Sequence, residues 1–351
     1  MLACALALSL QLTSLVVAAP SFSVSVSSPQ LSVNGVSNLH VTAAISNTGS
    51  ETLRLLKDPS SILRKDWETD SFRFTQNGTN VAPNFLGAMV KWSPELAAAT
   101  NAVTTIAPGQ TVEVAHDLST RYDFSALGAG VFDIHAYDTF THIDEAGNYI
   151  PLQAAVSTPV SVAITGSLNA VRTPVRSAKF AKRANFKGCS AAQETDIDHA
   201  VGAASELSTG AFNYFSSRSK ATLRYETWFG KFDPTRFNTV KANYKKIAAV
   251  HLSAFTYDCG CPHQDAFAYV YPEKFGEVYL CPAFFKAPPR GSDSQAGTIV
   301  HEVSHFTKTA ATKDLAYGKT KCATLAKNRP KKAITNADNI EYFAENDPAL
   351  S

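Results

Sequence analysis

Cysteine is missing from a long stretch of this chain, and its absence divides the sequence in two. Cys4 lies in the N-terminal apolar run, and no other cysteine occurs before Cys189. Five cysteines follow in the C-terminal half, too few for a small disulfide-dense protein but enough for a local framework. We therefore expect two modules, one without cysteine and one that carries disulfides.

An excess of one charge and an internal membrane span are also lacking. The chain has 32 Lys and Arg against 30 Asp and Glu, so its net charge of +2 gives no reason to expect nucleic acid or an anionic membrane as a partner. Its 351 residues exceed one ordinary core, and 45% hydrophobic residues with 18% charged ones are typical of folded domains. We expect two domains in a monomer, with no nucleic-acid or membrane partner.

The one long apolar run lies at the N-terminus, from Leu2 to Ala19. It ends in small residues before Pro20, and it is too short and lacks the basic flank of a membrane anchor. We predict a signal peptide over residues 1–18 and a secreted, extracellular protein. Secretion places the later cysteines in an oxidising compartment, where disulfides form.

Residues 19–165 have the pattern of short β-strands. Phe22, Val24 and Val26 alternate with serines, and Gly and Pro punctuate further short apolar runs. These runs are Leu39–Val41, Val103–Ile106, Val112–Val114, Val131–Ile134 and Val160–Ile164. The pattern predicts an antiparallel β-sandwich, which also carries a glycosylation sequon at Asn77.

A basic linker follows over residues 166–183 and ends in Lys182-Arg183. A dibasic pair in an exposed linker of a secreted chain is a candidate processing site. The cysteine-bearing half begins directly after it. We therefore interpret residues 19–165 as a pro-domain and expect the mature protein to begin at or near Ala184.

Residues 184–351 change to helical periodicity. Ala192–Leu207 and Val240–Val250 carry apolar residues at spacings of three and four, whereas Phe267–Tyr271 and Val278–Cys281 suggest a short hairpin. Ser292–Ser294 offers caps for a further helix. The fold class that we predict is α+β, a mainly helical domain with a small hairpin or sheet, preceded by the β-sandwich-like domain.

The capped helix contains the run His301-Glu302-Val303-Ser304-His305. Two histidines four residues apart lie on one helical face and can bind one Zn²⁺, while Glu302 is directed toward the metal's water. The pattern predicts a metal-dependent hydrolase with one zinc ion and with proteins or peptides as substrates.

Zinc needs a third protein ligand, and three carboxylates compete for that role. Lys308 and Ala311 stand where a metzincin would need Gly and His, so a carboxylate must serve instead. Asp314 lies nine residues after His305, and Glu341 and Glu345 are the rivals expected of a thermolysin-like site.

The cysteines leave a separate alternative open. Cys259 and Cys261 are too close in sequence to bridge each other easily, so each is expected to pair elsewhere. A metal knuckle that includes His263 is the other interpretation. An odd cysteine remains, most simply Cys322.

The histidine motif, followed by Thr312-x-Asp314-x-x-Tyr317-Gly318, resembles that of the aspzincins, the deuterolysin-like zinc peptidases. The similarity covers residues 185–351 and is greatest to the secreted fungal peptidyl-Lys metalloendopeptidases. Ala311 departs from the family, which usually has Gly there. Four further segments carry the resemblance: Thr227–Gly230, Phe267–Pro272, Asp293–Thr298 and Asn336–Asn339.

The resemblance implies a role for each matching residue. His301, His305 and Asp314 would bind zinc, Glu302 would be the general base, and Tyr317 would stabilise the oxyanion. It also implies the disulfides Cys189–Cys259 and Cys261–Cys281, with Cys322 outside the pattern.

Substrate choice is expected to depend on Asp338 and Glu341, which are three residues apart in a segment of helical pattern. Spacing alone favours a solvated acidic face, whereas the resemblance implies a lysine pocket and cleavage on the amino side of lysine. A broad deuterolysin, a gluzincin that uses Glu341 or Glu345, and a non-catalytic binding module are the alternatives. Residues 19–188 contain no thiol, so we expect latency from steric cover by the pro-domain or from a ligand such as a histidine.

Overall fold

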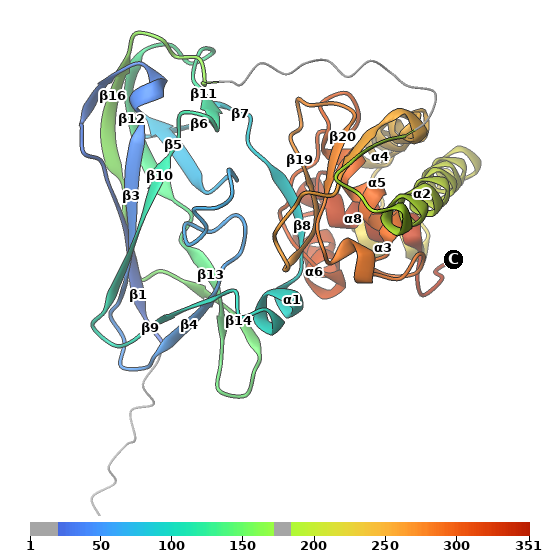
Figure 1. Ribbon diagram of the computed structural model, residues 1–351, viewed down its shortest axis with the longest axis horizontal. Coiled ribbons are helices and arrows are strands. Elements are labelled where there is room, and N and C mark those ends of the chain that lie inside the picture. The colour runs from blue at the N-terminus through green and yellow to red at the C-terminus, as the bar shows by residue number, and fades with distance from the viewer. Residues whose placement is uncertain (1–19, 172–183) are drawn as a thin grey trace, which may run out of the picture.

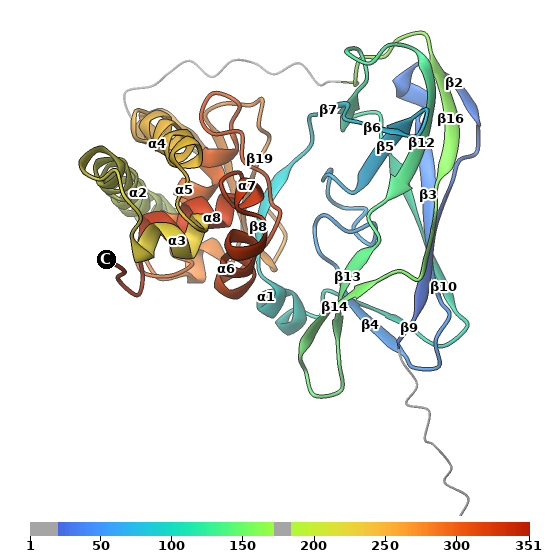
Figure 2. The same ribbon diagram turned by 180° about the vertical axis from the view of Figure 1, so that it is seen from behind.

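The computed structural model describes residues 20–171 and 184–351, which form a β-rich N-terminal unit and a largely helical C-terminal unit (Figures 1 and 2). The expected signal peptide and the Lys182-Arg183 pair lie outside the described residues. The predicted α+β class is confirmed. Within the described residues, no helix is both long and apolar enough to span a membrane.

Two sheets of the N-terminal unit bury their inner faces in one shared core. In β1, Phe22, Val24 and Val26 are buried while the intervening serines are not, because successive strand residues point to opposite faces. The first sheet has the order β10 (Thr111–Asp117), β3 (His40–Asn47), β1 (Phe22–Ser27), β15 (Val156–Thr158). The second has the order β2 (Ser32–Asn34), β16 (Val160–Thr165), β12 (Gly130–Ala136), β5 (Phe72–Gln76), β6 (Thr79–Val81).

The remaining N-terminal elements lie nearer the C-terminal unit. A further sheet has the order β14 (Tyr149–Gln153), β13 (Thr139–Ile143), β4 (Leu53–Leu56), β9 (Val103–Ile106), and a short pair joins β11 (Tyr122–Asp123) to β7 (Asn84–Phe85). Between β7 and β9 the chain runs outside these sheets as β8 (Met89–Trp92) and α1 (Pro94–Ala99). Each apolar run singled out in the sequence of this unit overlaps a strand.

The C-terminal unit packs its helices against a five-stranded sheet. The sheet order is β17 (Asn185–Lys187), β18 (Thr256–Asp258), β20 (Glu277–Leu280), β19 (Ala266–Val270), β8. The expected hairpin is therefore β19–β20 within a larger sheet. The helices are α2 (Ala191–Ser217), α3 (Leu223–Phe229), α4 (Pro234–Ala248), α5 (Gln295–His305), α6 (Lys319–Asn328), α7 (Pro330–Ala333) and α8 (Ala337–Glu345).

The edge strand of this sheet comes from the N-terminal unit. Figure 1 shows β8 crossing from the β-rich unit to lie beside β19. The two strands are antiparallel, with Val90 opposite Tyr269 and Met89 opposite Val270. The two units therefore share one continuous sheet, which the sequence did not predict.

Helix α5 lies in the centre of the C-terminal core. The Ser294 side chain caps it by accepting a hydrogen bond from the Gly297 amide, and every residue of the helix is buried. It packs against α8, which is also buried along almost its whole length. Zinc-site candidates on α5 and carboxylates on α8 are thus placed on two facing helices.

The structure contains the disulfides Cys189–Cys259 and Cys261–Cys281. These bridges exclude the alternative of a metal knuckle around Cys259 and Cys261. Cys322 is free and buried.

Candidate metal centre and active-site cleft

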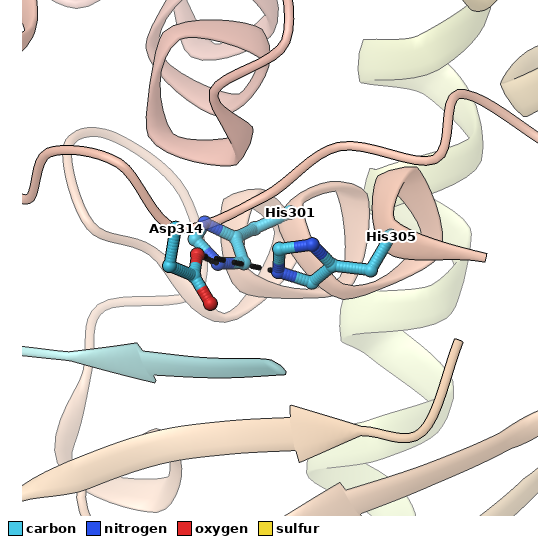
Figure 3. A group of neighbouring side chains, drawn as sticks. All are labelled: His301, His305 and Asp314. Carbon is cyan, nitrogen blue, oxygen red and sulfur yellow. Dashed lines mark ion pairs between the residues drawn. The ribbon is translucent and has the colours of Figure 1, made fainter. Parts of the chain in front are cut away.

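Three candidate ligands converge at the C-terminal end of α5 (Figure 3). His301 and His305 lie one helical turn apart, and both side chains are fully buried. Asp314, from the loop after the helix, brings its Oδ1 atom to 3.1 Å from His301 Nε2 and 3.3 Å from His305 Nε2. One carboxylate oxygen therefore faces both imidazoles.

The opposite nitrogen of each ring is held by an acceptor. His305 Nδ1 lies 3.0 Å from the Thr312 carbonyl oxygen, and His301 Nδ1 lies 3.2 Å from Glu341 Oε2. When Nδ1 carries the proton for these contacts, the lone pair of Nε2 is free to bind a metal.

An observation independent of the sequence motif indicates that these residues fit a zinc ion. His301 Nε2, His305 Nε2 and Asp314 Oδ1 are buried and have no hydrogen-bond partner. Buried polar atoms rarely stay without a partner. Zinc bonds of about 2.0–2.1 Å in a tetrahedron would separate ligand atoms by about 3.3 Å, close to the spacing observed here.

The loop that carries Asp314 is shaped by Asn336, a residue to which sequence reasoning gave no role. Asn336 Oδ1 accepts hydrogen bonds from the amides of Leu315 and Ala316. Ala311, at the start of this loop, has a φ of 49°. This left-handed conformation explains why glycine is favoured at that position, since any side chain strains it.

Burial shifts the pKa of the other two side chains expected at the site, Glu302 and Tyr317. The Glu302 side chain is fully buried, and burial raises the pKa of its carboxyl to about 7, although His301 and His305 oppose the rise. Burial also raises the pKa of the Tyr317 hydroxyl, which therefore stays protonated as a donor. Glu302 can thus take up a proton near neutral pH, and Tyr317 can donate a hydrogen bond.

Strand β8 makes hydrogen bonds to both of these side chains. The Tyr317 hydroxyl donates to the Val90 carbonyl oxygen at 3.0 Å, and the Lys91 amide donates to Glu302 Oε1 at 3.3 Å. The Val90 amide donates to Asp314 Oδ2 at 2.8 Å. The backbone around the Val90–Lys91 bond therefore lies directly against the candidate site.

The Lys91 side chain enters an acidic pocket beside the histidines. Its Nζ atom lies 2.6 Å from Glu341 Oε2 and 3.0 Å from Asp293 Oδ1. Only 1% of Lys91 is exposed. Burial lowers the pKa of this ammonium, but Glu341 and the neighbouring carboxylates outweigh burial and raise it well above its ordinary value. The pocket therefore holds a lysine in its charged form.

The two carboxylates expected to bind lysine together are used differently. Glu341 contacts the Lys91 ammonium, whereas Asp338 accepts a hydrogen bond from the Gly318 amide at 2.7 Å and lies 3.0 Å from His301 Nδ1. Asp293 takes the second place at the ammonium. Sequence reasoning assigned Asp293 no role at an ammonium, since it lies in the expected helix cap and in a segment that only carries the family resemblance.

Comparison with known proteins identifies the family of the chain. A family model described as lysine-specific metallo-endopeptidase, of the M35 aspzincins, matches residues 214–345. The peptidyl-Lys metalloendopeptidase of Grifola frondosa is 43% identical over 336 residues, which are 95% of this chain and 94% of that protein. An extracellular protease of Aeromonas hydrophila is 36% identical over 320 residues, 89% of each chain.

A solved structure of a zinc peptidase from Grifola frondosa is 47% identical and spans 46% of this chain and 100% of its own, with a TM-score of 0.46. The resemblance inferred from the histidine motif and its downstream residues is confirmed by the sequence matches. Identity of 43% over nearly the full length of a relative places the chain in that relative's family. The chain belongs to the M35 aspzincin family of zinc metalloendopeptidases.

Proposed function

We propose that this chain is a secreted endopeptidase that cleaves peptide bonds on the amino side of lysine. The observation that carries the proposal is the binding of a lysine ammonium by Glu341 and Asp293, directly beside the candidate metal ligands. Charge-assisted hydrogen bonds in a buried pocket favour lysine over uncharged side chains. The printed name of the Grifola frondosa relative agrees with this specificity.

His301, His305 and Asp314 would hold one zinc ion through their converging, otherwise unpartnered atoms. Zinc supplies Lewis-acid polarisation of the carbonyl and lowers the pKa of water. A second group of potential ligands, His301 with Asp338 and Glu341, shares His301 but faces its other ring nitrogen. We assign that group to orienting His301 and to binding lysine.

Glu302 acts as the general base in this proposal. It accepts a proton from the attacking water and returns it to the amine of the lysine residue as the peptide bond breaks. Tyr317 donates a hydrogen bond to the carbonyl oxygen as negative charge develops there. The contacts of these two side chains to the Lys91 amide and the Val90 carbonyl support these roles.

We further propose that the N-terminal unit is a pro-domain that is removed after Lys182-Arg183. The position of the pair between the two units supports this, as does the occupation of the cleft by β8. Secretion is supported by the N-terminal apolar run, the two disulfides and the name of the Aeromonas hydrophila relative.

The rival ligand assignments are less well supported by geometry. Glu341 faces Nδ1 of His301 rather than the converging Nε2 atoms, and Glu345 accepts hydrogen bonds from Ser294 at the start of α5. A broad deuterolysin would not need a pocket that buries a lysine ammonium.

Cleavage-site mapping tests the proposal. Processed enzyme, cut in the linker and separated from its N-terminal unit, is incubated with a denatured protein, and the fragments are identified by mass spectrometry. We expect new N-termini that begin with lysine, loss of cleavage with a chelator, and recovery with zinc. Glu302→Gln is the matched control, which should retain zinc but lose activity. A fragment map without lysine bias would leave only the broad protease, and full activity in the chelator would overturn the zinc assignment.

A further inference from the structure

We infer that β8 lies in the cleft as a bound substrate does, with the Val90–Lys91 bond at the cleavage position, and that this occupation keeps the precursor latent. The inference rests on the proposed function and deepens it. It assigns the occupant of the cleft, the peptide bond presented for cleavage, and a further specificity residue, Asp293.

Strand β8 binds to the C-terminal unit in the manner of an extended peptide. It extends the sheet of the C-terminal unit by antiparallel pairing with β19, the mode in which an extended peptide adds to a sheet edge. The main-chain bonds of such a strand give affinity, and side-chain pockets give specificity. Val90 lies opposite Tyr269, and the next side chain, Lys91, enters the acidic pocket.

One peptide bond of β8 lies between the two candidate catalytic side chains. The carbonyl oxygen on one side of Val90–Lys91 receives the Tyr317 hydroxyl, and the amide nitrogen on the other side donates to Glu302. These are the two atoms that a hydrolase must polarise and protonate. Hydrolysis would form a C–O bond from water to the Val90 carbonyl carbon, break the C–N bond, and give the proton to the Lys91 amine.

The pocket around the Lys91 ammonium contains two carboxylates and two aromatic rings. Asp293 adds a second carboxylate to Glu341, and the rings of Phe267 and Tyr342 lie 5.1 and 5.8 Å from the ammonium. Tyr342 also donates a hydrogen bond to Asp293 Oδ1 at 2.8 Å, which orients that carboxylate. We therefore assign Asp293 as a specificity residue for external substrates as well.

Both ends of β8 are fixed by the rest of the precursor. On one side the Ala88 amide donates to the Glu68 carbonyl oxygen at 2.8 Å. On the other side the Trp92 indole donates to Asp265 at 3.1 Å, and Asp265 also pairs with Arg64. Because both flanks are held, the strand stays in the cleft even when the Val90–Lys91 bond is cut, and free substrate is excluded.

Of the two expected sources of latency, steric cover and a ligand such as a histidine, this arrangement is a form of steric cover. Strand β8 provides a lysine side chain and main-chain groups. The steric cover is thus β8, a strand whose sequence resembles that of a substrate.

The test uses the full-length precursor in which Lys182 and Arg183 are both replaced by Ala, so that the linker stays intact. Hydrolysis of a fluorogenic peptide that contains one lysine is compared for this precursor and for its Lys91→Met form, with Lys65→Met as a control at an exposed lysine of the same unit. Loss of the buried ion pair should raise the activity of the Lys91→Met precursor by about tenfold or more, whereas Lys65→Met should leave it unchanged.

A second arm does not depend on the folding of a variant. A synthetic peptide of residues 86–95 is given to the processed wild-type enzyme, and it should compete with the fluorogenic substrate and be cut only between Val90 and Lys91. Asp293→Asn in the processed enzyme should lower the ratio of cleavage before lysine to cleavage before norleucine. Cleavage of this peptide elsewhere, or a Lys91→Met precursor as latent as its parent, overturns the inference while the processed enzyme still cuts before lysine. A zinc-loaded processed enzyme that cuts no peptide overturns the proposed function instead.

Discussion

Asp338 and Glu341 differ in what they contact, so their removal should have different consequences. Both carboxylates lie near His301 Nδ1, Asp338 at 3.0 Å and Glu341 at 3.2 Å, but Asp338 also accepts a hydrogen bond from the Gly318 amide, whereas Glu341 also binds the Lys91 ammonium. We expect Asp338→Asn to weaken zinc binding by about 10–100-fold, as for other groups that orient metal ligands. Glu341→Gln should mainly reduce the preference for lysine, by about 10–100-fold for a lost charged hydrogen bond.

Zinc affinity is measured by competition with a chelator, and lysine preference by mass spectrometry of a digested peptide library. The two variants serve as controls for each other, because they lie one turn apart on α8. Equal losses of zinc and of lysine preference in both variants would contradict the division of roles.

His116 makes the stability of the N-terminal unit depend on pH. Burial and the neighbouring Arg121 lower the pKa of this imidazole to about 4. Its Nε2 atom lies 3.0 Å from the Ile62 carbonyl oxygen, which fits a neutral ring that donates there. Between pH 6.5 and about 4 the unfolded chain binds a proton that the folded chain does not. The free energy of unfolding therefore falls as the pH falls through this window.

Denaturant unfolding of the precursor at pH 7 and pH 4.5 checks the effect. We expect the loss of stability on acidification to be smaller in His116→Gln by about 2–3 kcal/mol, because glutamine does not titrate. His40, which is exposed in the same unit, provides a control as His40→Gln. An acid-induced loss that is the same in His116→Gln and in the wild type would contradict this account.

At the scale of elements, the loop between α5 and Asp314 contains backbone strain that one substitution can remove. Ala311 is held at a φ of 49°, where an alanine costs roughly 1 kcal/mol or more relative to glycine. Ala311→Gly should therefore raise the free energy of unfolding of the precursor by up to about 1 kcal/mol, reduced by the greater freedom of glycine in the unfolded chain. Thermal unfolding measures it, and a lower melting temperature for Ala311→Gly would exclude strain as the reason for the family's glycine.

The helices that carry the candidate histidine ligands and the carboxylates beside them were predictable because their information is local. The cap at Ser294 and the spacing of His301 and His305 predict α5, and the apolar pattern after Asn336 predicts α8. Strand β8 was not predictable in the same way. Its four residues, Met89–Trp92, are all buried and show no alternation, and their partner strand lies in the other unit. Only the long-range packing of the two units determines this pairing.

The same reasoning explains why the lysine pocket was only half predicted. Glu341 is marked by its place on a helix with Asp338, whereas Asp293 reaches the pocket through the tertiary packing of the segment before α5. Spacing along one helix could not show that Glu341 contacts the Lys91 ammonium whereas Asp338 contacts the Gly318 amide.

At the scale of the whole molecule, the two units are joined by more than β8. Arg64 of the N-terminal unit and Asp265 of the C-terminal unit form a buried ion pair at 2.6 Å. Trp67 packs on His263, with ring centroids 4.0 Å apart. These contacts are non-covalent and do not involve the linker. We therefore expect the units to stay associated after the linker is cut.

Arg64→Leu tests this expectation, since it leaves Asp265 buried without its partner, at a cost of about 3–5 kcal/mol. After linker cleavage, size-exclusion chromatography should show the wild-type units eluting together and the Arg64→Leu units separating. Arg54→Leu, at an exposed arginine, is the matched control. Separation of the wild-type units as soon as the linker is cut would show that the interface is weak.

The shared sheet also affects how readily the protein associates with other copies of itself. While β8 is in place, the amide and carbonyl groups along that side of β19 are covered. Removal of the N-terminal unit exposes a bare sheet edge, and such edges pair readily with other chains. The precursor can therefore fold at high concentration without edge-to-edge pairing of its chains. Once the N-terminal unit has been separated, the C-terminal unit at high concentration should associate edge to edge, visible by light scattering and suppressed by a lysine-containing peptide.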